Sequence, residues 1–139
     1  MMLTAILLLS VQLSEPELIT QNGEKEVFAP AFRGRWADTL SDCGVDGLSA
    51  FEVAETRIDT YEGDSVLLNS TPMIHETAPN GQPAYTIVGL VASRGETEVG
   101  LGKVRMSRVG AALYMSNAEA VQEEDHFKSD YANVRCPNR

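Results

Sequence analysis

The side chains that usually carry catalytic or metal chemistry are few and scattered in this chain. The two histidines, His75 and His126, lie far apart, and neither has a second ligand at the spacing of a zinc site. His126 follows three acidic residues, and a helix here would bring only Gln122 beside it. We therefore expect two solvated histidines, no metal site and no cofactor.

The serines and glycines form no catalytic motif either. No serine lies in a G-x-S-x-G elbow, and nothing in the spacing fixes the geometry of a Ser–His–Asp triad. The string "VGLGKVRM" lacks the G-x-x-x-x-G-K-[ST] pattern of a phosphate loop. We interpret Gly89, Gly100 and Gly102 as bends in strands. The sequence predicts a protein that is not an enzyme.

The chain has two cysteines, Cys43 and Cys136. Such a distant pair favours one disulfide formed in an oxidising compartment, and the alternative is two buried thiols in a cytosolic protein. In the chain-entropy model, closing a loop of this length removes about 4–5 kcal/mol from the unfolded ensemble. The predicted bond would therefore be a main source of stability.

The N-terminal stretch predicts export. Residues 1–14, "MMLTAILLLSVQLS", are apolar, uncharged and shorter than the roughly 20 residues of a membrane span, which favours a signal peptide. No basic residue precedes the stretch and no A-x-A site follows it, so an N-terminal strand or helix of the domain is the alternative. Residues 15–27 are interpreted as an acidic flexible arm, and residues 28–139 as a single β-rich domain. We expect a periplasmic or secreted protein without a transmembrane segment in its mature chain.

The formal net charge of −9, without a Lys/Arg cluster in the sequence, argues against nucleic-acid binding and against anionic lipid surfaces. The acidic surface mainly favours solubility, and recruitment of a basic protein partner is the alternative.

The elements that would position these residues are mostly strands. The turn signals "EGD" and "APNGQP" separate short apolar runs, which is typical of an antiparallel meander barrel or sandwich. Ser116 followed by Glu119 matches a capping box, so one short helix is predicted over residues 117–127, before the last strand. The predicted strands are residues 32–38, 51–61, 65–71, 72–76, 84–93, 99–106, 111–116 and 128–136.

Two families share motifs with this chain. Gly34, Trp36 and Arg135 resemble the G-x-W and closing basic residue of the calycin group, which includes the lipocalins; the resemblance implies a Trp at the barrel floor with Arg135 across its ring. A longer pattern, "GRWADTLSDCG", "IDTYEGDSVL" and a terminal "YANVRC", is similar to small alphaproteobacterial envelope β-barrel proteins of unassigned activity. The residues of this pattern are Gly34, Arg35, Trp36, Ala37, Asp42, Cys43, Tyr61, Glu62, Arg135 and Cys136.

The two expected contacts of the first strand constrain each other. If Trp36 faces Arg135 on a straight antiparallel ladder, Cys43 ends about 20 Å from Cys136, at about 3.3 Å per residue. A disulfide needs Cα atoms within about 7 Å. Both contacts therefore require the chain to double back between Ala37 and Cys43, and "DTLSD" has suitable turn residues.

For function, the preferred hypothesis is an exported non-enzymatic envelope protein that acts by contact with another envelope protein. The alternative is a calycin-like binder of a small apolar ligand, or an inhibitor of a secreted protease whose arm enters the protease cleft. The binder requires an internal cavity of at least about 300 Å³. Its candidate lining is Met73, Met106, Met115, Tyr85 and Tyr114, although small barrels are usually filled by their own side chains, which favours ordinary core for these residues.

Overall fold

The computed structural model describes residues 27–44, 49–61, 63–94 and 99–137. The predicted signal peptide and nearly all of the predicted arm lie outside these residues. The strands are β1 (Gly34–Ala37), β2 (Phe51–Val53), β3 (Arg57–Thr60), β4 (Gly63–Ser70), β5 (Ile74–Thr77), β6 (Pro83–Arg94), β7 (Val99–Val109), β8 (Ala112–Asn117) and β9 (Ala132–Arg135).

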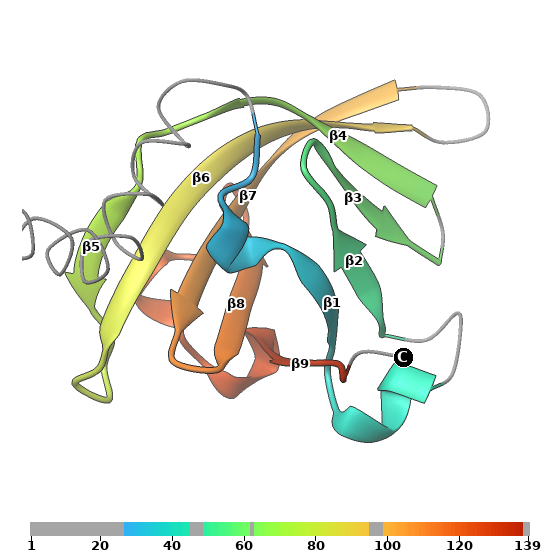
Figure 1. The fold of residues 1–139 in the computed structure, drawn as a ribbon. Coiled ribbons are helices and arrows are strands. Elements are labelled where there is room, and N and C mark those ends of the chain that lie inside the picture. Colours follow the sequence, from blue (N-terminus) through green and yellow to red (C-terminus); the bar gives the residue numbers. More distant parts are fainter. Residues whose placement is uncertain (1–26, 45–48, 62, 95–98, 138–139) are drawn as a thin grey trace, which may run out of the picture.

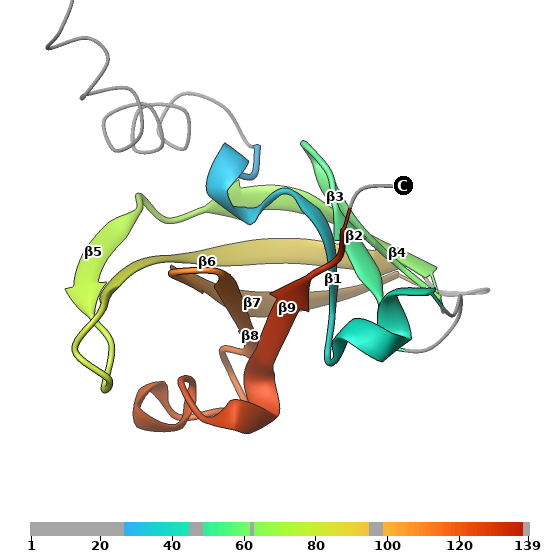
Figure 2. The same ribbon diagram turned by 60° about the horizontal axis from the view of Figure 1, so that its bottom comes forward.

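Eight of these strands close into an antiparallel barrel (Figures 1 and 2). Strands β1 to β4 pair in chain order, as do strands β5 to β9. β4 pairs with β6, and β1 pairs with β9, so the first and last strands lie side by side. β5 pairs only with β6 and extends the sheet outside the closed ring. The prediction of an all-β antiparallel meander is confirmed, and of the two predicted architectures, barrel or sandwich, the chain forms the barrel.

Side chains alternate between the interior and the outer wall, as strand geometry requires. On β6, Ile87 is fully buried and Val91 is 7% exposed, whereas Val88 and Leu90 are only half-buried. One end of the barrel is filled by a cluster to which the 3-10 turn η1 (Pro30–Phe32) contributes. The largest fully buried apolar side chains of this cluster are Trp36, Phe28, Phe32, Ile87, Met106 and Leu113.

The predicted turns fall where the glycines permit them. Gly81 has φ +88° in the turn between β5 and β6, and Gly110 has φ +55° between β7 and β8. Both angles are in the left-handed region that glycine adopts without a Cβ penalty. The run over residues 51–61 forms two strands, because the chain turns where the Ala54 amide donates to the Arg57 carbonyl.

The helix predicted over residues 117–127 is wrong. This stretch holds an Asn117 turn and the 3-10 turn η3 (Glu123–Asp125), followed by η4 (Ser129–Tyr131), and it lies outside the barrel beside β8 (Figure 2). Ser116, the predicted cap, belongs to β8 and bonds His126. The Asn117 carboxamide instead accepts the amides of Glu119 and Ala120. Packing of the stretch against the wall overrides its local helix preference.

The first strand doubles back as the two contacts require. The 3-10 turn η2 (Leu40–Gly44) brings the Cα of Cys43 within 5.5 Å of the Cα of Cys136, and the two form a disulfide. Trp36 is at the same time in register with Arg135. The Ser49 hydroxyl accepts the Asp38 amide and donates to Asp42, which stabilises the return of the chain. The predicted disulfide and turn are both confirmed.

Candidate functional site

The closed end of the barrel is built around Trp36. Its ring is fully buried, and its indole Nε1 donates to the Phe32 carbonyl at 3.0 Å. The Arg135 guanidinium lies over the ring, 4.3 Å from its centroid. A cation over an indole contributes about 0.5–2 kcal/mol, depending on how far water is excluded. This geometry is the one that the calycin resemblance implied.

Gly34 explains why glycine precedes the tryptophan by two positions. Residues two apart in a strand share a face, so Gly34 lies on the side of Trp36 where Arg135 runs. A Cβ on Gly34 would overlap Arg135 Nη1, and Gly34 has φ +123°. The space left free lets Arg135 Nη1 donate to the Arg33 carbonyl at 2.9 Å.

A second arginine at this end was missed from the sequence. Arg108, near the end of β7, lies 5.2 Å from the Trp36 centroid and donates to the carbonyls of Ala31 (2.6 Å) and Gly110 (2.8 Å). Burial and then the charge of Arg135 lower the pKa of Arg108. The sequence signal that could have found Arg108 is the alternation along β7. It places residue 108 on the same face as Val104 and Met106, which are apolar and therefore face the interior.

A cup of about 360 Å³ lies at the other end of the barrel. Tyr85 of β6 pairs with Arg108 at the closed end, and Val91, which lines the cup, is six residues further along β6, about 20 Å away. The floor of the cup is apolar and consists of Ile58, Val91, Val104 and Met115, all packed in or against the core.

The rim of the cup is polar. Ser65 and Ser93 face each other across the β4–β6 pair and share a hydrogen bond of 2.9 Å between their hydroxyls, while Thr60 and Asn117 line the same opening. Gly102 also lines the cup, and a Cβ there would meet nothing within 4 Å. The barrel is therefore filled at one end and has an open recess at the other.

Only one of the five side chains proposed as a ligand lining lies in this cup, namely Met115. Met73 and Met106 are buried core residues, and Tyr85 packs against the core. Tyr114 lies outside the barrel, where it packs with Phe127. The competing interpretation of these residues as ordinary core is thus correct for most of them.

The expectation of a solvated His126 is wrong. Its ring is fully buried between the outer wall and the stretch after β8, with Ser116 Oγ at 2.6 Å from Nδ1 and Ser107 Oγ at 2.9 Å from Nε2. Thr86 Oγ1 extends the network to Ser107 at 2.5 Å. Burial, and secondarily the charge of Arg105, lower the pKa of His126 to about 4, so the ring is neutral at pH 7.

This serine–histidine network connects the outer wall of the barrel to the stretch after β8. Its four side chains are at most 6% exposed, so the three hydroxyls and the imidazole are largely shielded from solvent. The neutral imidazole can donate on one nitrogen and accept on the other, which satisfies both serines without a buried charge. The other histidine, His75, is exposed and stacks on Tyr85 at 4.7 Å between ring centroids.

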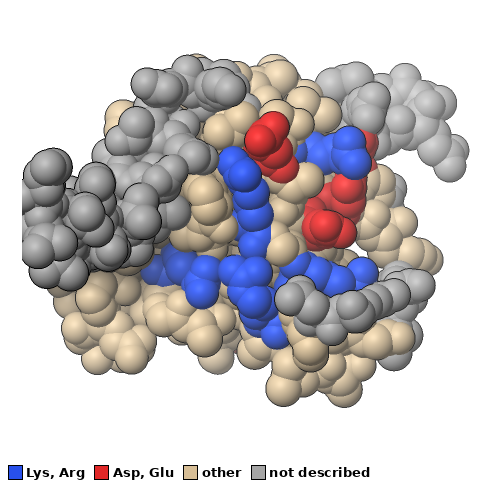
Figure 3. All heavy atoms as spheres, in the orientation of Figure 1, with Lys and Arg blue, Asp and Glu red and all other residues tan. Residues whose placement is uncertain are grey.

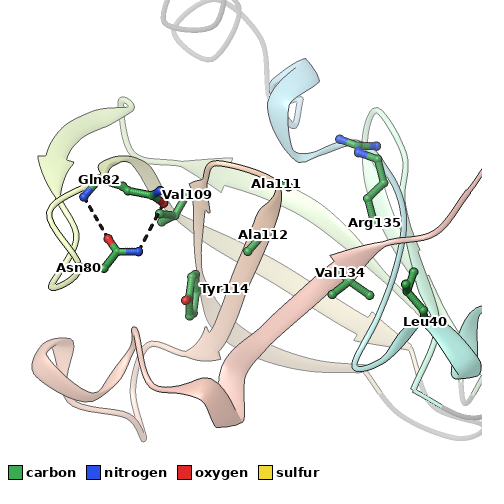
Figure 4. A pocket seen from close by; sticks show the side chains of 9 residues that line it. All are labelled: Leu40, Asn80, Gln82, Val109, Ala111, Ala112, Tyr114, Val134 and Arg135. Atoms are coloured by element: carbon green, nitrogen blue, oxygen red, sulfur yellow. Dashed lines mark hydrogen bonds between the residues drawn. The ribbon is translucent and has the colours of Figure 1, made fainter.

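A shallow groove of about 440 Å³ lies on the outer wall (Figure 4). Its apolar lining comes mainly from Val109, Ala112, Tyr114 and Val134, with Leu40 at one side. The carboxamides of Asn80 and Gln82 at the opposite side bond each other at 3.3 Å. The groove thus presents apolar surface with amide groups at one end.

Within the described part of the chain, no three His, Cys, Asp or Glu side chains are grouped so as to hold a metal ion. No helix there has the length and apolar character to cross a membrane.

The comparisons with known proteins find no match: no protein family, curated protein or solved structure is similar to this chain at a significant level. The likeness to envelope β-barrel proteins and to calycins therefore stays a prediction. The fold itself defines the chain as an eight-stranded antiparallel barrel with one end closed by Trp36 and Arg135.

Proposed function

We propose that this protein is an exported, non-enzymatic binding protein that holds a small amphipathic molecule in the cup of its barrel. The observation that carries the proposal is the open recess of about 360 Å³ in a barrel whose other end is filled by core side chains. Pockets that bury small ligands begin at about 300 Å³.

The chemistry of the cup favours a ligand with an apolar body and one polar end. The floor offers only aliphatic and thioether groups, whereas the rim offers the hydroxyls of Thr60, Ser65 and Ser93 and the carboxamide of Asn117; Lys103 also lines the opening. A bound molecule would bury its apolar part on the floor and exchange hydrogen bonds with the rim. The Ser65–Ser93 bond shows that two of these hydroxyls already point at each other.

A fluorescent probe tests the proposal. We expect the neutral dye N-phenyl-1-naphthylamine to bind saturably, and medium-chain alkanols to displace it. Gly102→Leu should reduce the affinity for the dye at least about tenfold, because the new side chain enters the cup from a position with free space around its Cβ.

The matched control is Ala92→Leu, which adds apolar bulk to the outer wall of β6 opposite Leu101. Its dye affinity should stay within about twofold of the wild type. Equal dye binding by the Gly102→Leu variant, with unchanged circular dichroism, would contradict the cup as the site.

Contact with another envelope protein is the second candidate function. The observation that favours it is the exposure of large apolar side chains on the outer surface, with Leu40 63%, Tyr61 71% and Leu101 70% exposed. Isolated exposed apolar residues are common, so the decisive test is capture of a partner by the full chain and loss of that partner in a Tyr61→Ser, Leu101→Ser variant.

Export is supported by the disulfide, because such bonds persist in oxidising compartments. Mass spectrometry of the protein purified from its natural cells tests this part. We expect a mature chain without about the first 14 residues, whose mass is lower by two hydrogen atoms because the two thiols have formed a disulfide. A full-length chain with free thiols would contradict periplasmic or secreted localisation.

A further inference from the structure

The closed end of the barrel carries positive charge in a chain whose net charge is −9. Arg33 and Arg35 flank Gly34, and Arg108 and Arg135 both lie over Trp36. Figure 3 shows basic side chains gathered across the middle of the face that holds β1. These arginines come from three separate segments, so folding creates a cluster where the sequence has none.

The two arginines over Trp36 have donors to spare. A guanidinium carries five N–H groups; within the described residues Arg108 directs two hydrogen bonds to carbonyls and Arg135 directs one. Their acceptors are main-chain oxygens, and no carboxylate of the described residues pairs with either. Arg33 meets Glu55 only at 4.0 Å, with the glutamate side chain 69% exposed.

The charges of this pair repel each other. Arg108 is half-buried, and its pKa is lowered by burial and by the Arg135 charge. The ring of Trp36 attracts both cations but cannot neutralise them. An oxyanion between the two guanidiniums would remove the repulsion and accept hydrogen bonds from both, in the fork geometry by which arginine recognises carboxylate and phosphate.

We propose that Arg108 and Arg135 form a binding site for a single oxyanion group, phosphate or carboxylate, at the closed end of the barrel. Arg33 adds a third positive charge beside it, because its main-chain oxygen accepts from Arg135 and its side chain is 29% exposed. The site is separate from the cup and does not depend on it. An anionic small molecule or an acidic side chain of a partner would supply the group.

The only tryptophan of the chain lies in this site and reports on it. We expect sodium phosphate, titrated at pH 7 against sodium chloride at equal ionic strength, to change Trp36 fluorescence saturably. Arg108→Gln and Arg135→Gln should each weaken this response at least about tenfold, because each removes a charged fork. Arg57→Gln is the matched control, since Arg57 lies on β3 and pairs with Asp59 at 2.8 Å.

A parallel titration with sodium acetate distinguishes a phosphate group from a carboxylate group as the bound oxyanion. Saturation by phosphate alone assigns a phosphate-bearing ligand, and saturation by both shows that a carboxylate suffices; saturation by neither overturns the proposal. Equal weakening in the Arg57→Gln variant also overturns it, because a general charge effect would then explain the response.

If Arg135→Gln does not fold, the wild type still decides the matter by nuclear magnetic resonance. Phosphate should shift the amide signals at and next to Ala31, Arg33 and Gly110, whose carbonyls accept hydrogen bonds from the two arginines. Shifts confined to other strands would contradict the site.

Discussion

At the scale of the residue, the G-x-W motif is an arrangement for placing a charge over a ring. Gly34 has no side chain because Arg135 occupies that volume, and its backbone has a φ that other residues adopt only under strain. Trp36 offers its face to the guanidinium and its N–H to the Phe32 carbonyl. Gly34, Trp36 and Arg135 are thus each fixed by a different physical requirement: free volume, an aromatic face and a cation.

Gly34→Ala should therefore destabilise the protein by about 2–4 kcal/mol. The cost combines a left-handed φ with displacement of Arg135 from the ring, each about 1–2 kcal/mol. Urea unfolding followed by circular dichroism measures it. Gly44→Ala is the control, since a Cβ at Gly44 meets nothing within 4 Å and its change should stay below about 0.5 kcal/mol. Equal effects of the two substitutions would refute this account of the motif.

His126 makes stability depend on pH in a defined window. Its pKa is about 4 in the folded protein and 6.5 unfolded. The unfolded chain therefore binds this proton first as pH falls, so the contribution of His126 is complete above pH 6.5 and is lost progressively down to pH 4. The full loss corresponds to roughly 3 kcal/mol, at about 1.4 kcal/mol for each pH unit.

Comparison of the wild type with His126→Gln isolates this effect from the carboxylates that titrate near pH 4. The variant should be less stable at pH 7, because two buried serines lose a partner, and its stability should fall less between pH 6.5 and 4. His75→Gln, at an exposed position outside this network, is the control for the loss of a histidine. Parallel curves for all three proteins would show that His126 is not the titrating group.

At the scale of the element, the sequence predicts strands and turns well and the stretch after β8 poorly. Alternating apolar residues and glycine turns are local signals, which is why β6, β7 and the turns at Gly81 and Gly110 appear near their predicted positions. The helix prediction was wrong because its capping residue, Ser116, instead forms a hydrogen bond with His126. This contact joins β8 to the stretch that follows it, and no local sequence pattern encodes it.

The residues of the candidate sites also divide into those that the sequence predicts and those that only the closed barrel reveals. Trp36, Arg135 and the two cysteines were predictable from motif and count, and the turn at η2 followed from requiring both contacts. Arg108 and the cup were not, because they depend on how far distant strands curve and on which end remains unfilled. Such information lies in the closed barrel rather than in any one strand.

At the scale of the whole molecule, the barrel closes between segments from opposite ends of the domain. The β1–β9 seam has only two registered pairs, Trp36 with Arg135 and Ala37 with Val134. The disulfide lies directly beside it and joins residues 93 positions apart. A short ladder between distant segments has a high closure entropy, so the covalent bond and the cation over Trp36 must supply much of its stability.

The Cys43→Ser, Cys136→Ser double variant should therefore lose about 4–5 kcal/mol in the chain-entropy model. It should also fold at least about tenfold more slowly, because the seam must find its partner without the covalent loop. Urea equilibrium curves and stopped-flow fluorescence of Trp36, which lies in the seam, measure both quantities. A loss carried entirely by faster unfolding, with an unchanged folding rate, would mean that the seam closes after the rate-limiting step and that the disulfide only holds a barrel already formed.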